Sequence, residues 1–364
     1  HGDDLPLNDW LNKFTWPREA KMSPEDIKIG AMLAICEMLH SATTCFNEHY
    51  FHMGSIAQAV EKSGMRACLG YSMIDRVKFQ DKVEFDFEGK GEKELEIAKK
   101  FAKKWNGGAR GRISVSVSPH SAHTCSKGLL EACAGLANEL GCILHAHAAE
   151  TKEELRVCKK AHGSTPIGAL SKYGCLGNKT VLAHAIYVNA ADISHLSKSG
   201  SSVCLCPVSN MKLASGSAPP VGKFISSAIN LAVGTDGAAS NNSLNLFESM
   251  KFGALVQKNI HENPAVARAD DYLQMGMQGG ARALHLDCGE IKEGKLADIA
   301  MLDLASPNLA PFANNAGWLL YAAGPQNVLD VIIDGKFIMR EGKILTFDEG
   351  KILASAQKIA EKLN

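Results

Sequence analysis

The segment CILHAHAAE (142–150) is a short β-rich run that ends in polar side chains. A stretch with helical spacing of its apolar residues, LLEACAGLANEL (129–140), precedes it. The same alternation of short β-rich runs and helical stretches continues in both directions along the chain. Such a pattern is typical of repeated βα units that build a parallel sheet.

Seven β-rich runs can be counted, and they are TTCFNE (43–48), RACLGYSM (66–73), ISVSVS (113–118), CILHAH (142–147), TVLAH (180–184), SVCLC (202–206) and INLAVGTD (229–236). A closed barrel of strand–helix units needs eight strands. The fold class that we predict is therefore α/β, a (β/α)8 TIM-type barrel that lacks its first strand.

The last part of the chain has a different pattern, with short runs and turns such as GEIKEGKLADIAMLDL that indicate antiparallel strands. Barrels of this type commonly take roughly 250 residues, so a chain of this length leaves room for an appendage. We predict a barrel over residues 1–288, a small C-terminal β-sandwich appendage over 289–347 and a C-terminal helix over 348–364.

The composition excludes several classes of partner. The 39 basic side chains balance the 39 acidic ones, which argues against nucleic acid or an anionic membrane as a partner. No apolar run approaches the roughly 20 residues that cross a bilayer, and the polar N-terminus does not resemble a signal peptide. The eleven cysteines include no CxxC pair, so we read them as reduced thiols. We expect a cytoplasmic protein that forms a homo-oligomer.

Polar side chains stand where the expected strands end, which is where such barrels hold their working residues. His147 and Glu150 follow one strand, His184 ends the next, and Asp236 ends the last. Imidazole and carboxylate groups are ligands that zinc or ferrous iron takes in hydrolytic sites. The sequence therefore predicts a metal-dependent hydrolase.

Each of these residues also has a structural interpretation. A single histidine such as His184 is more often a hydrogen-bonded core group, Glu150 could favour a helix N-terminus, and Asp236 could cap a helix. Their joint position at one edge of a barrel favours the functional interpretation. His145 lies one layer deeper and is predicted to be structural, whereas His49 remains open. No GxSxG, Walker or GxGxxG motif supports a different chemistry.

Five ordered strings carry a resemblance to a known family: VSPHSAHTCS (117–126), HAHAAET (145–151), VLAHAIYV (181–188), PVSNMKLASG (207–216) and GTDGAASNNSLNLF (234–247). The chain resembles the amidohydrolase superfamily, and more narrowly its deaminases of methylthioadenosine, S-adenosylhomocysteine and 5'-deoxyadenosine. The resemblance covers nearly the whole chain.

This resemblance implies roles for four residues at the strand ends. His147 and Asp236 match metal ligands, so one divalent metal is implied, Zn²⁺ in preference to Fe²⁺. Glu150 matches the glutamate that handles protons at the purine ring, and His184 matches the histidine beside the attacking water. The implied reaction is hydrolysis of the 6-amino group of a 5'-substituted adenosine, with ammonia as the second product.

The resemblance also implies a set of substrate contacts. Trp10 and Glu19 match residues that meet the purine and the ribose hydroxyls, and His120 matches a further contact with the ring. Glu150 and Asp236 would touch the substrate as well. A packed aromatic side chain remains the alternative for Trp10. The implied partners are an adenine nucleoside and water.

Two departures from the family pattern qualify this reading. The first strand of the family carries a His-x-His pair that completes the metal site, and nothing before His1 supplies it. We therefore expect that the 364-residue chain lacks several dozen residues of the natural protein. In addition, Tyr71 stands where relatives that accept homocysteine carry an arginine, which weakens the case for a substrate with a carboxylate.

Two alternative functions remain at this stage. Another amidohydrolase reaction, on guanine, a pterin or a triazine, would use much the same metal ligands, but Glu19 favours a substrate with a ribose. A non-catalytic barrel that binds a nucleoside is the second alternative, because the histidine pair is absent. The presence of both Glu150 and Asp236 argues against it.

Overall fold

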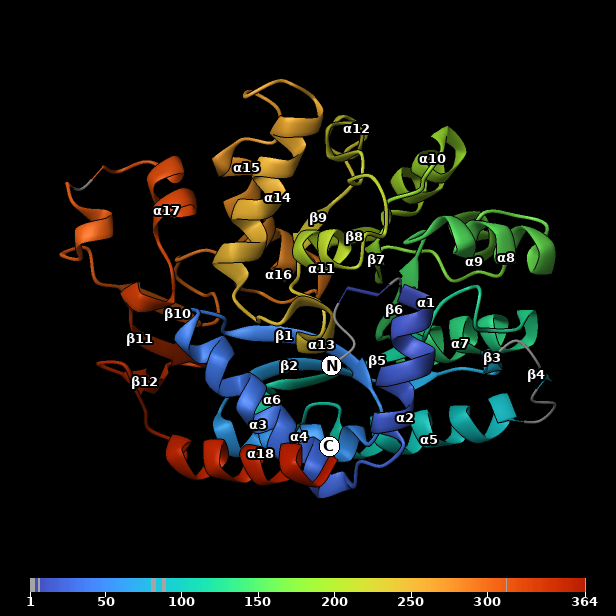
Figure 1. Ribbon diagram of the computed structural model, residues 1–364, viewed down its shortest axis with the longest axis horizontal. Helices are drawn as coiled ribbons and strands as arrows, with labels where there is room; N and C mark the ends of the chain where they lie inside the picture. The colour runs from blue at the N-terminus through green and yellow to red at the C-terminus, as the bar shows by residue number, and fades with distance from the viewer. Residues whose placement is uncertain (1–3, 6, 80–82, 87–89, 312, 364) are drawn as a thin grey trace.

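The computed structural model describes residues 4–5, 7–79, 83–86, 90–311 and 313–363. A sheet of seven parallel strands, in the order β1-β2-β5-β6-β7-β8-β9, curls through the centre of the molecule (Figure 1). Its strands are β1 (Cys45–Tyr50), β2 (Arg66–Met73), β5 (Ile113–Pro119), β6 (Ile143–Ala148), β7 (Thr180–His184), β8 (Ser202–Leu205) and β9 (Leu231–Val233). The sheet forms a half-barrel, and the predicted fold class is confirmed.

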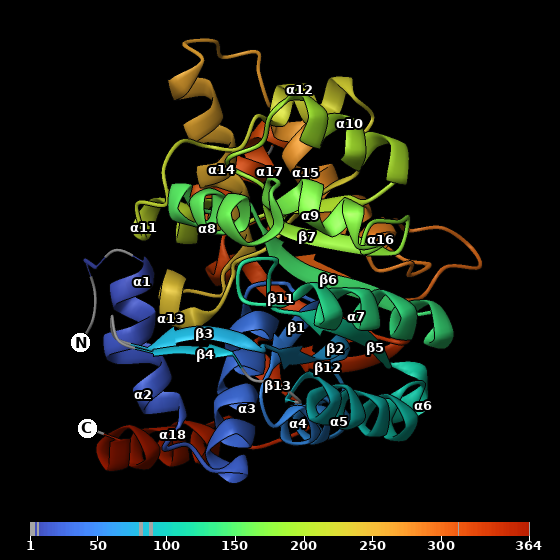
Figure 2. The ribbon, with the colours of Figure 1, turned by 90° about the vertical axis from the view of Figure 1, so that its right-hand side faces the viewer.

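Helices connect the strands and pack around the sheet (Figures 1 and 2). They are α1 (Leu7–Trp10), α2 (Trp16–Glu19), α3 (Pro24–His40), α4 (Met53–Ser63), α5 (Lys90–Trp105), α6 (Gly108–Gly111), α7 (Lys127–Leu140), α8 (Lys152–His162), α9 (Pro166–Lys172), α10 (Ala190–Ser199), α11 (Pro207–Lys212), α12 (Val221–Ser226), α13 (Ala238–Asn241), α14 (Leu246–Ile260), α15 (Ala269–Gln274), α16 (Gly280–Ala283), α17 (Ala316–Ala322) and α18 (Glu349–Leu363). A π-helical turn, Met275–Gly279, joins α15 to α16, so residues 269–283 form one nearly continuous helical run.

Local sequence signals set the ends of the two helices on either side of β6. Ser126 caps α7 by accepting a hydrogen bond from the backbone of Leu129, and Thr151 caps α8 in the same way. Gly141 ends α7 in the left-handed conformation, with φ of 60°, which glycine adopts without steric cost. These caps fix where the chain enters and leaves β6, and thereby where His147 and Glu150 lie.

A two-stranded hairpin was not predicted from the sequence. Strands β3 (Arg76–Phe79) and β4 (Val83–Asp86) pair antiparallel after β2. Each has four residues with charges among the apolar ones, so neither gives a periodic signal long enough to separate from a loop.

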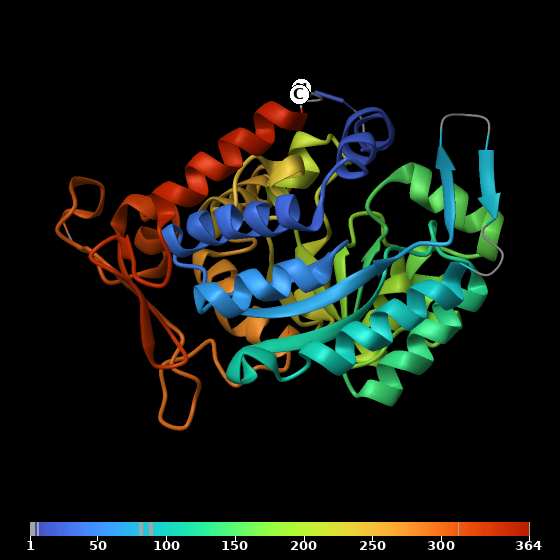
Figure 3. The same cartoon turned by 90° about the horizontal axis from the view of Figure 1, so that it is seen from below.

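A second, antiparallel sheet follows the barrel and contains β10 (Ile299–Leu302), β11 (Val328–Ile333), β12 (Lys336–Arg340) and β13 (Lys343–Ile344). The final helix α18 lies beside α3, as Figure 3 shows, and Lys362 pairs with Asp26 at 2.8 Å. The chain therefore returns to its N-terminal part. Whether the parts divide at residues 288 and 347 stays a prediction.

Among the residues that the structure describes, no helix is both long enough and apolar enough to span a bilayer.

A buried ion pair ties β2 to the segment that leads into the second sheet. Arg66 donates from Nε and Nη2 to the two carboxylate oxygens of Asp298, at 2.5 and 3.0 Å, and the two side chains are 4% and 2% exposed. Removing one partner of such a pair leaves an uncompensated buried charge.

We expect Asp298→Ala to lower the free energy of unfolding by about 3 kcal/mol. Arg66 would remain buried, with the more exposed Asp334, 3.5 Å from its Nη2, as its remaining ionic partner. Urea unfolding followed by circular dichroism would measure the change. The matched control is Glu153→Ala, which breaks the exposed pair with Arg156 and should change stability little. Equal effects of the two substitutions would contradict the assignment.

Candidate active site

Three histidines lie together at the carboxyl ends of adjacent strands. His120 follows β5, His147 stands near the end of β6, and His184 ends β7. The ring centroid of His147 lies 4.7 Å from that of His120 and 5.4 Å from that of His184. The parallel register, which pairs Ala148 with His184, places these side chains at one edge of the sheet. The structure thus brings together three of the residues that the sequence selected.

The ring of His147 is held in one orientation. Its Nδ1 lies 2.8 Å from the carbonyl oxygen of His120, which can only accept a hydrogen bond, so Nδ1 carries the proton. Burial, together with the nearby His184, lowers the pKa of His147 to about 4. A neutral ring with its Nε2 lone pair free is the form that binds a metal ion.

Asp236 follows β9 and is surrounded by donors. Its Oδ2 accepts hydrogen bonds from Ser209 at 2.6 Å and Ser240 at 2.9 Å, and its Oδ1 accepts one from the backbone of Gly237 at 2.8 Å. Burial acts to raise the pKa of Asp236, but His184 and the Ser209 hydroxyl outweigh it and lower the pKa. The group is therefore held as a carboxylate.

Glu150 and His184 face each other, with Glu150 Oε2 3.7 Å from His184 Nε2. Ser215 donates to Glu150 Oε1 at 3.2 Å, and Asn210 Oδ1 lies 2.8 Å from His184 Nδ1. Burial raises the pKa of Glu150. Burial acts to lower the pKa of His184, but Glu150 and Asp236 together raise it.

The backbone is strained at this site. The backbone angle φ is 76° at His184, 63° at Asp236 and 55° at Ala149. All three values lie in the left-handed region, which residues other than glycine rarely adopt. Such conformations cost about 1–3 kcal/mol each and persist where the surrounding structure imposes them. All three residues lie at or just beyond the ends of β6, β7 and β9, where the site is formed.

Four residues to which the sequence gave no role contact the predicted ones. Ser209, Asn210 and Ser215 are described above, and Glu154 Oε2 accepts a hydrogen bond from the backbone of Glu150 at 2.7 Å. The spacing of Thr151 and Glu154, which matches a capping box, could have signalled Glu154. The other three act across long sequence separations, for which a single sequence gives no signal.

For Glu19 and Trp10, two of the predicted substrate contacts, the structure shows the surroundings but no contact with a substrate. Glu19, on α2, shares a hydrogen bond with Tyr50 of β1, and burial raises its pKa. It therefore lies beside the strand that carries His49. Trp10 is half-buried on α1, and its contact with a substrate stays a prediction.

Two histidines left as structural or open also belong to the cluster. The His49 ring centroid lies 4.6 Å from that of His145 and 4.5 Å from that of His147. His145 Nδ1 lies 3.0 Å from the side-chain amide nitrogen of Asn47, which donates to it. Within the described residues, His49 Nδ1 is buried without a hydrogen-bond partner. His49 therefore lies within the cluster, and whether its role is functional or structural stays open.

The donor set fits a divalent metal in kind but not in number. His147 Nε2 and Asp236 Oδ1 are suitable ligands, yet no group of three or more metal-binding side chains is arranged to hold an ion in the described part of the chain. His147 and Asp236 would contribute two ligands of a larger shell.

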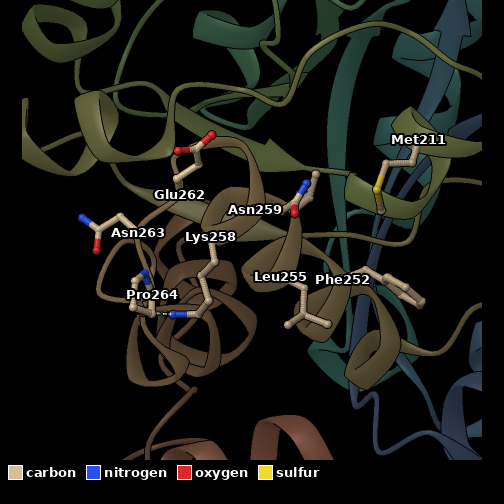
Figure 4. Close-up of a pocket in the computed structure, with 9 residues that line it drawn as sticks. Met211, Phe252, Leu255, Lys258, Asn259, Glu262, Asn263 and Pro264 are labelled. Atoms are coloured by element: carbon tan, nitrogen blue, oxygen red, sulfur yellow. Dashed lines mark hydrogen bonds between the residues drawn. The ribbon is translucent and has the colours of Figure 1, made fainter.

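An open pocket lies elsewhere, between α11 and α14, and Figure 4 shows its lining. None of the predicted site residues lines it; the lining is formed by Met211, Phe252, Leu255, Val256, Lys258, Asn259, Glu262, Asn263 and Pro264. The site is therefore identified by the chemistry of its side chains and not by this pocket.

The half-barrel and the histidine–carboxylate cluster at its strand ends define a hydrolase of the barrel class. The sequence profile of the Amidohydrolase family matches residues 1–338, and this chain belongs to that family. The resemblance to the amidohydrolase superfamily that the sequence showed is confirmed, and so is the prediction that the protein is an enzyme.

Several relatives are similar over the whole chain. A 5'-deoxyadenosine deaminase of Methanosarcina mazei is 40% identical over 363 residues, covering 100% of this chain and 82% of the relative. A 5-methylthioadenosine/S-adenosylhomocysteine deaminase of Desulforudis audaxviator is 38% identical, with the same coverage. The crystal structure of an adenosine deaminase from Xanthomonas campestris with bound zinc has a TM-score of 0.91 at 32% identity, covering 99% of this chain and 81% of that one. Family membership and this zinc-bound relative support a divalent metal.

Glu48 is a further buried carboxyl group beside the cluster. Burial, with the nearby negative charge of Asp236, raises its pKa to about 8 from an ordinary value of 4.5. Between these values the folded protein keeps a proton on Glu48 that the unfolded chain releases. Stability from this group is therefore lost as the pH rises through that window.

We expect Glu48→Gln to gain stability relative to the wild type as the pH rises from about 4.5 to about 8, and the difference to level off above that. Urea unfolding of both proteins at several pH values would measure it. A difference that does not change with pH would show that Glu48 is not held in its protonated form.

Proposed function

We propose that this protein is a hydrolytic deaminase that converts the 6-amino group of a 5'-substituted adenosine to the inosine form and releases ammonia. The observation that carries the proposal is the convergence of Glu150, His184 and Asp236, two carboxyl groups with opposite pKa shifts that both interact with one imidazole. The expectation of such a deaminase from the sequence is confirmed by the relatives, which are deaminases of adenosine-type nucleosides.

In the proposed mechanism the two carboxyl groups have different tasks. Glu150, whose pKa is raised, gives its proton to N1 of the purine and makes C6 electrophilic. Asp236 and His184 orient the attacking water and take its proton. The water oxygen bonds to C6, and Glu150, now a carboxylate, takes the remaining proton of that oxygen and passes it to the amino nitrogen. The bond from C6 to the nitrogen then breaks, ammonia leaves, and the proton taken by Asp236 and His184 returns to Glu150. The same division of labour operates in zinc nucleobase deaminases.

His147 and Asp236 are the residues that would hold the metal, and the proposed ion is Zn²⁺, with Fe²⁺ as the alternative. A divalent ion at such a site lowers the pKa of water toward neutrality. His147 is prepared for this role because its Nδ1 proton is bonded to the His120 carbonyl. Its pKa of about 4 keeps the ring neutral at physiological pH.

The choice of nucleoside over other amidohydrolase substrates rests on Glu19 and on the relatives. Glu19 is hydrogen-bonded with Tyr50 of β1, and we propose that its carboxyl group accepts hydrogen bonds from the ribose hydroxyls. A triazine hydrolase variant is 20% identical to this chain, and the guanine deaminase of E. coli is 22% identical. Both have the fold of this chain, and at these identities the similarity supports the fold alone. A cytoplasmic location, a homo-oligomeric state and the absence of nucleic-acid partners remain parts of the proposal.

We expect Glu150→Gln to retain metal and to lower kcat by about 10²- to 10⁴-fold, the usual scale for loss of a general acid. His147→Ala should instead lose metal and activity together, because a metal ligand is gone. Ammonia release from 5'-deoxyadenosine and elemental analysis of the same preparations would measure both. Near-normal turnover in Glu150→Gln would remove Glu150 from the mechanism, and full metal content in His147→Ala would remove His147 as a ligand.

The surroundings of Tyr71 bear on the 5' substituent. Tyr71 stands on β2 where an arginine would pair with a carboxylate, and a phenol cannot form that charge-assisted pair. Burial, with the negative charge of Glu94, raises the pKa of Tyr71. Glu94 is held nearby through a hydrogen bond from the backbone of Ile74 at 2.7 Å. The carboxylate of Glu94 would repel a carboxylate on the 5' substituent of the substrate.

We therefore expect higher kcat/KM for 5'-deoxyadenosine or methylthioadenosine than for S-adenosylhomocysteine. Steady-state kinetics with the three substrates decide the order. The variant Tyr71→Arg should raise kcat/KM for S-adenosylhomocysteine selectively, and Tyr71→Phe is its matched control. A wild-type preference for S-adenosylhomocysteine would show that another group neutralises the carboxylate.

A further inference from the structure

One short segment contacts all three proposed catalytic groups. Within residues 207–216, which begin with α11, Ser209 donates to Asp236, Asn210 meets His184, and Ser215 donates to Glu150. Two of the three partners are hydroxyl donors to a carboxyl oxygen, whereas Asn210 contacts a ring nitrogen whose proton can move.

The contact between Asn210 and His184 is buried and short. Asn210 Oδ1 lies 2.8 Å from His184 Nδ1, and the two residues are 5% and 1% exposed. An amide oxygen only accepts hydrogen bonds, so Nδ1 of His184 must carry the proton in this arrangement. In the neutral ring the other nitrogen, Nε2, then keeps its lone pair, and it is the atom that faces Glu150.

This arrangement opposes the intrinsic preference of the side chain. A free neutral histidine favours the proton on Nε2, and in that form His184 could not take a proton from water through the nitrogen that faces the site. A hydrogen bond to one ring nitrogen selects which nitrogen is protonated. The bond would then act on catalysis without Asn210 touching the substrate.

We propose that Asn210 is a positioning residue that holds neutral His184 with its proton on Nδ1, so that Nε2 can accept a proton from the attacking water. The mechanistic half of this statement rests on the proposed function. The position of the proton does not, and it can be measured without turnover.

The alternative is that Asn210 only joins α11 to β7. In that case its removal would lower stability and leave the ring proton where it was. The chain offers a control of this kind in Asn327, a fully buried asparagine beside the second sheet that bonds the side chain of Asn308. Asn327→Leu should cost stability without any effect on His184.

The test is NMR of the full chain with ¹⁵N-labelled histidine rings, where the two-bond couplings report which nitrogen is protonated at a pH at which the ring is neutral. The His184→Asn variant assigns the signals. We expect the wild type and Asn210→Asp, which keeps an acceptor, to carry the proton on Nδ1. In Asn210→Leu, which has a similar size and no acceptor, the proton should move to Nε2.

The kinetic result expected with it is a fall in kcat of about 10- to 100-fold in Asn210→Leu, with a smaller change in KM and partial recovery in Asn210→Asp. A wild-type ring protonated on Nε2 would overturn the inference, even if Asn210→Leu fails to fold. So would a folded Asn210→Leu protein with the proton still on Nδ1. Absence of deaminase activity with the expected proton position would contradict the proposed function and leave the assignment of the proton intact.

Discussion

The site depends on the parallel pairing of β6 with β7. That ladder pairs His147 with Ala183 and Ala148 with His184, so the two strands end together and their polar residues meet. By alternation alone His147 and His184 would point to opposite faces of the sheet, because His147 pairs with Ala183. The left-handed backbone at His184, with a φ of 76°, ends that alternation, and the two rings lie 5.4 Å apart. The capped helices around β6 hold the register, since they fix the points at which the chain enters and leaves the strand.

A second layer of polar contacts makes this arrangement tolerable inside the protein. Buried ionisable groups are costly unless they are paired or hydrogen-bonded. Ser209 and Ser240 meet this requirement for Asp236, and Ser215 meets it in part for Glu150. These partners come from loops and short helices after β8 and β9. The segments that follow the strands therefore stabilise the charges that the strand ends present.

The sequence predicted the strands and the polar residues at their ends. It missed many of the residues that form hydrogen bonds or ring contacts with those polar residues. The β-rich runs were visible because burial on both faces leaves a continuous apolar signal, as in RACLGYSM (66–73), which is β2 to the residue. His147 and Asp236 could be selected because they are the last residues of such runs, CILHAH (142–147) and INLAVGTD (229–236). Asn210 and His49 could not be assigned, because their partners lie 26 and about a hundred residues away in the chain. Only the folded sheet brings those residues together.

The opposite behaviour of Glu150 and Asp236 follows from the balance, at each group, between burial and the hydrogen bonds and charges around it. Asp236 receives three hydrogen bonds and lies near His184, so its charged form is favoured. Burial raises the pKa of Glu150, and the negative charges of Asp236 and Glu154 add to it, so the protonated form is favoured despite His184 and one hydroxyl donor. Pairs of groups whose environments drive their pKa values apart are how one site holds both an acid and a base at neutral pH. The polar partners after β8 and β9 thus create the chemical difference between two carboxyl groups, and the barrel strands provide only their positions.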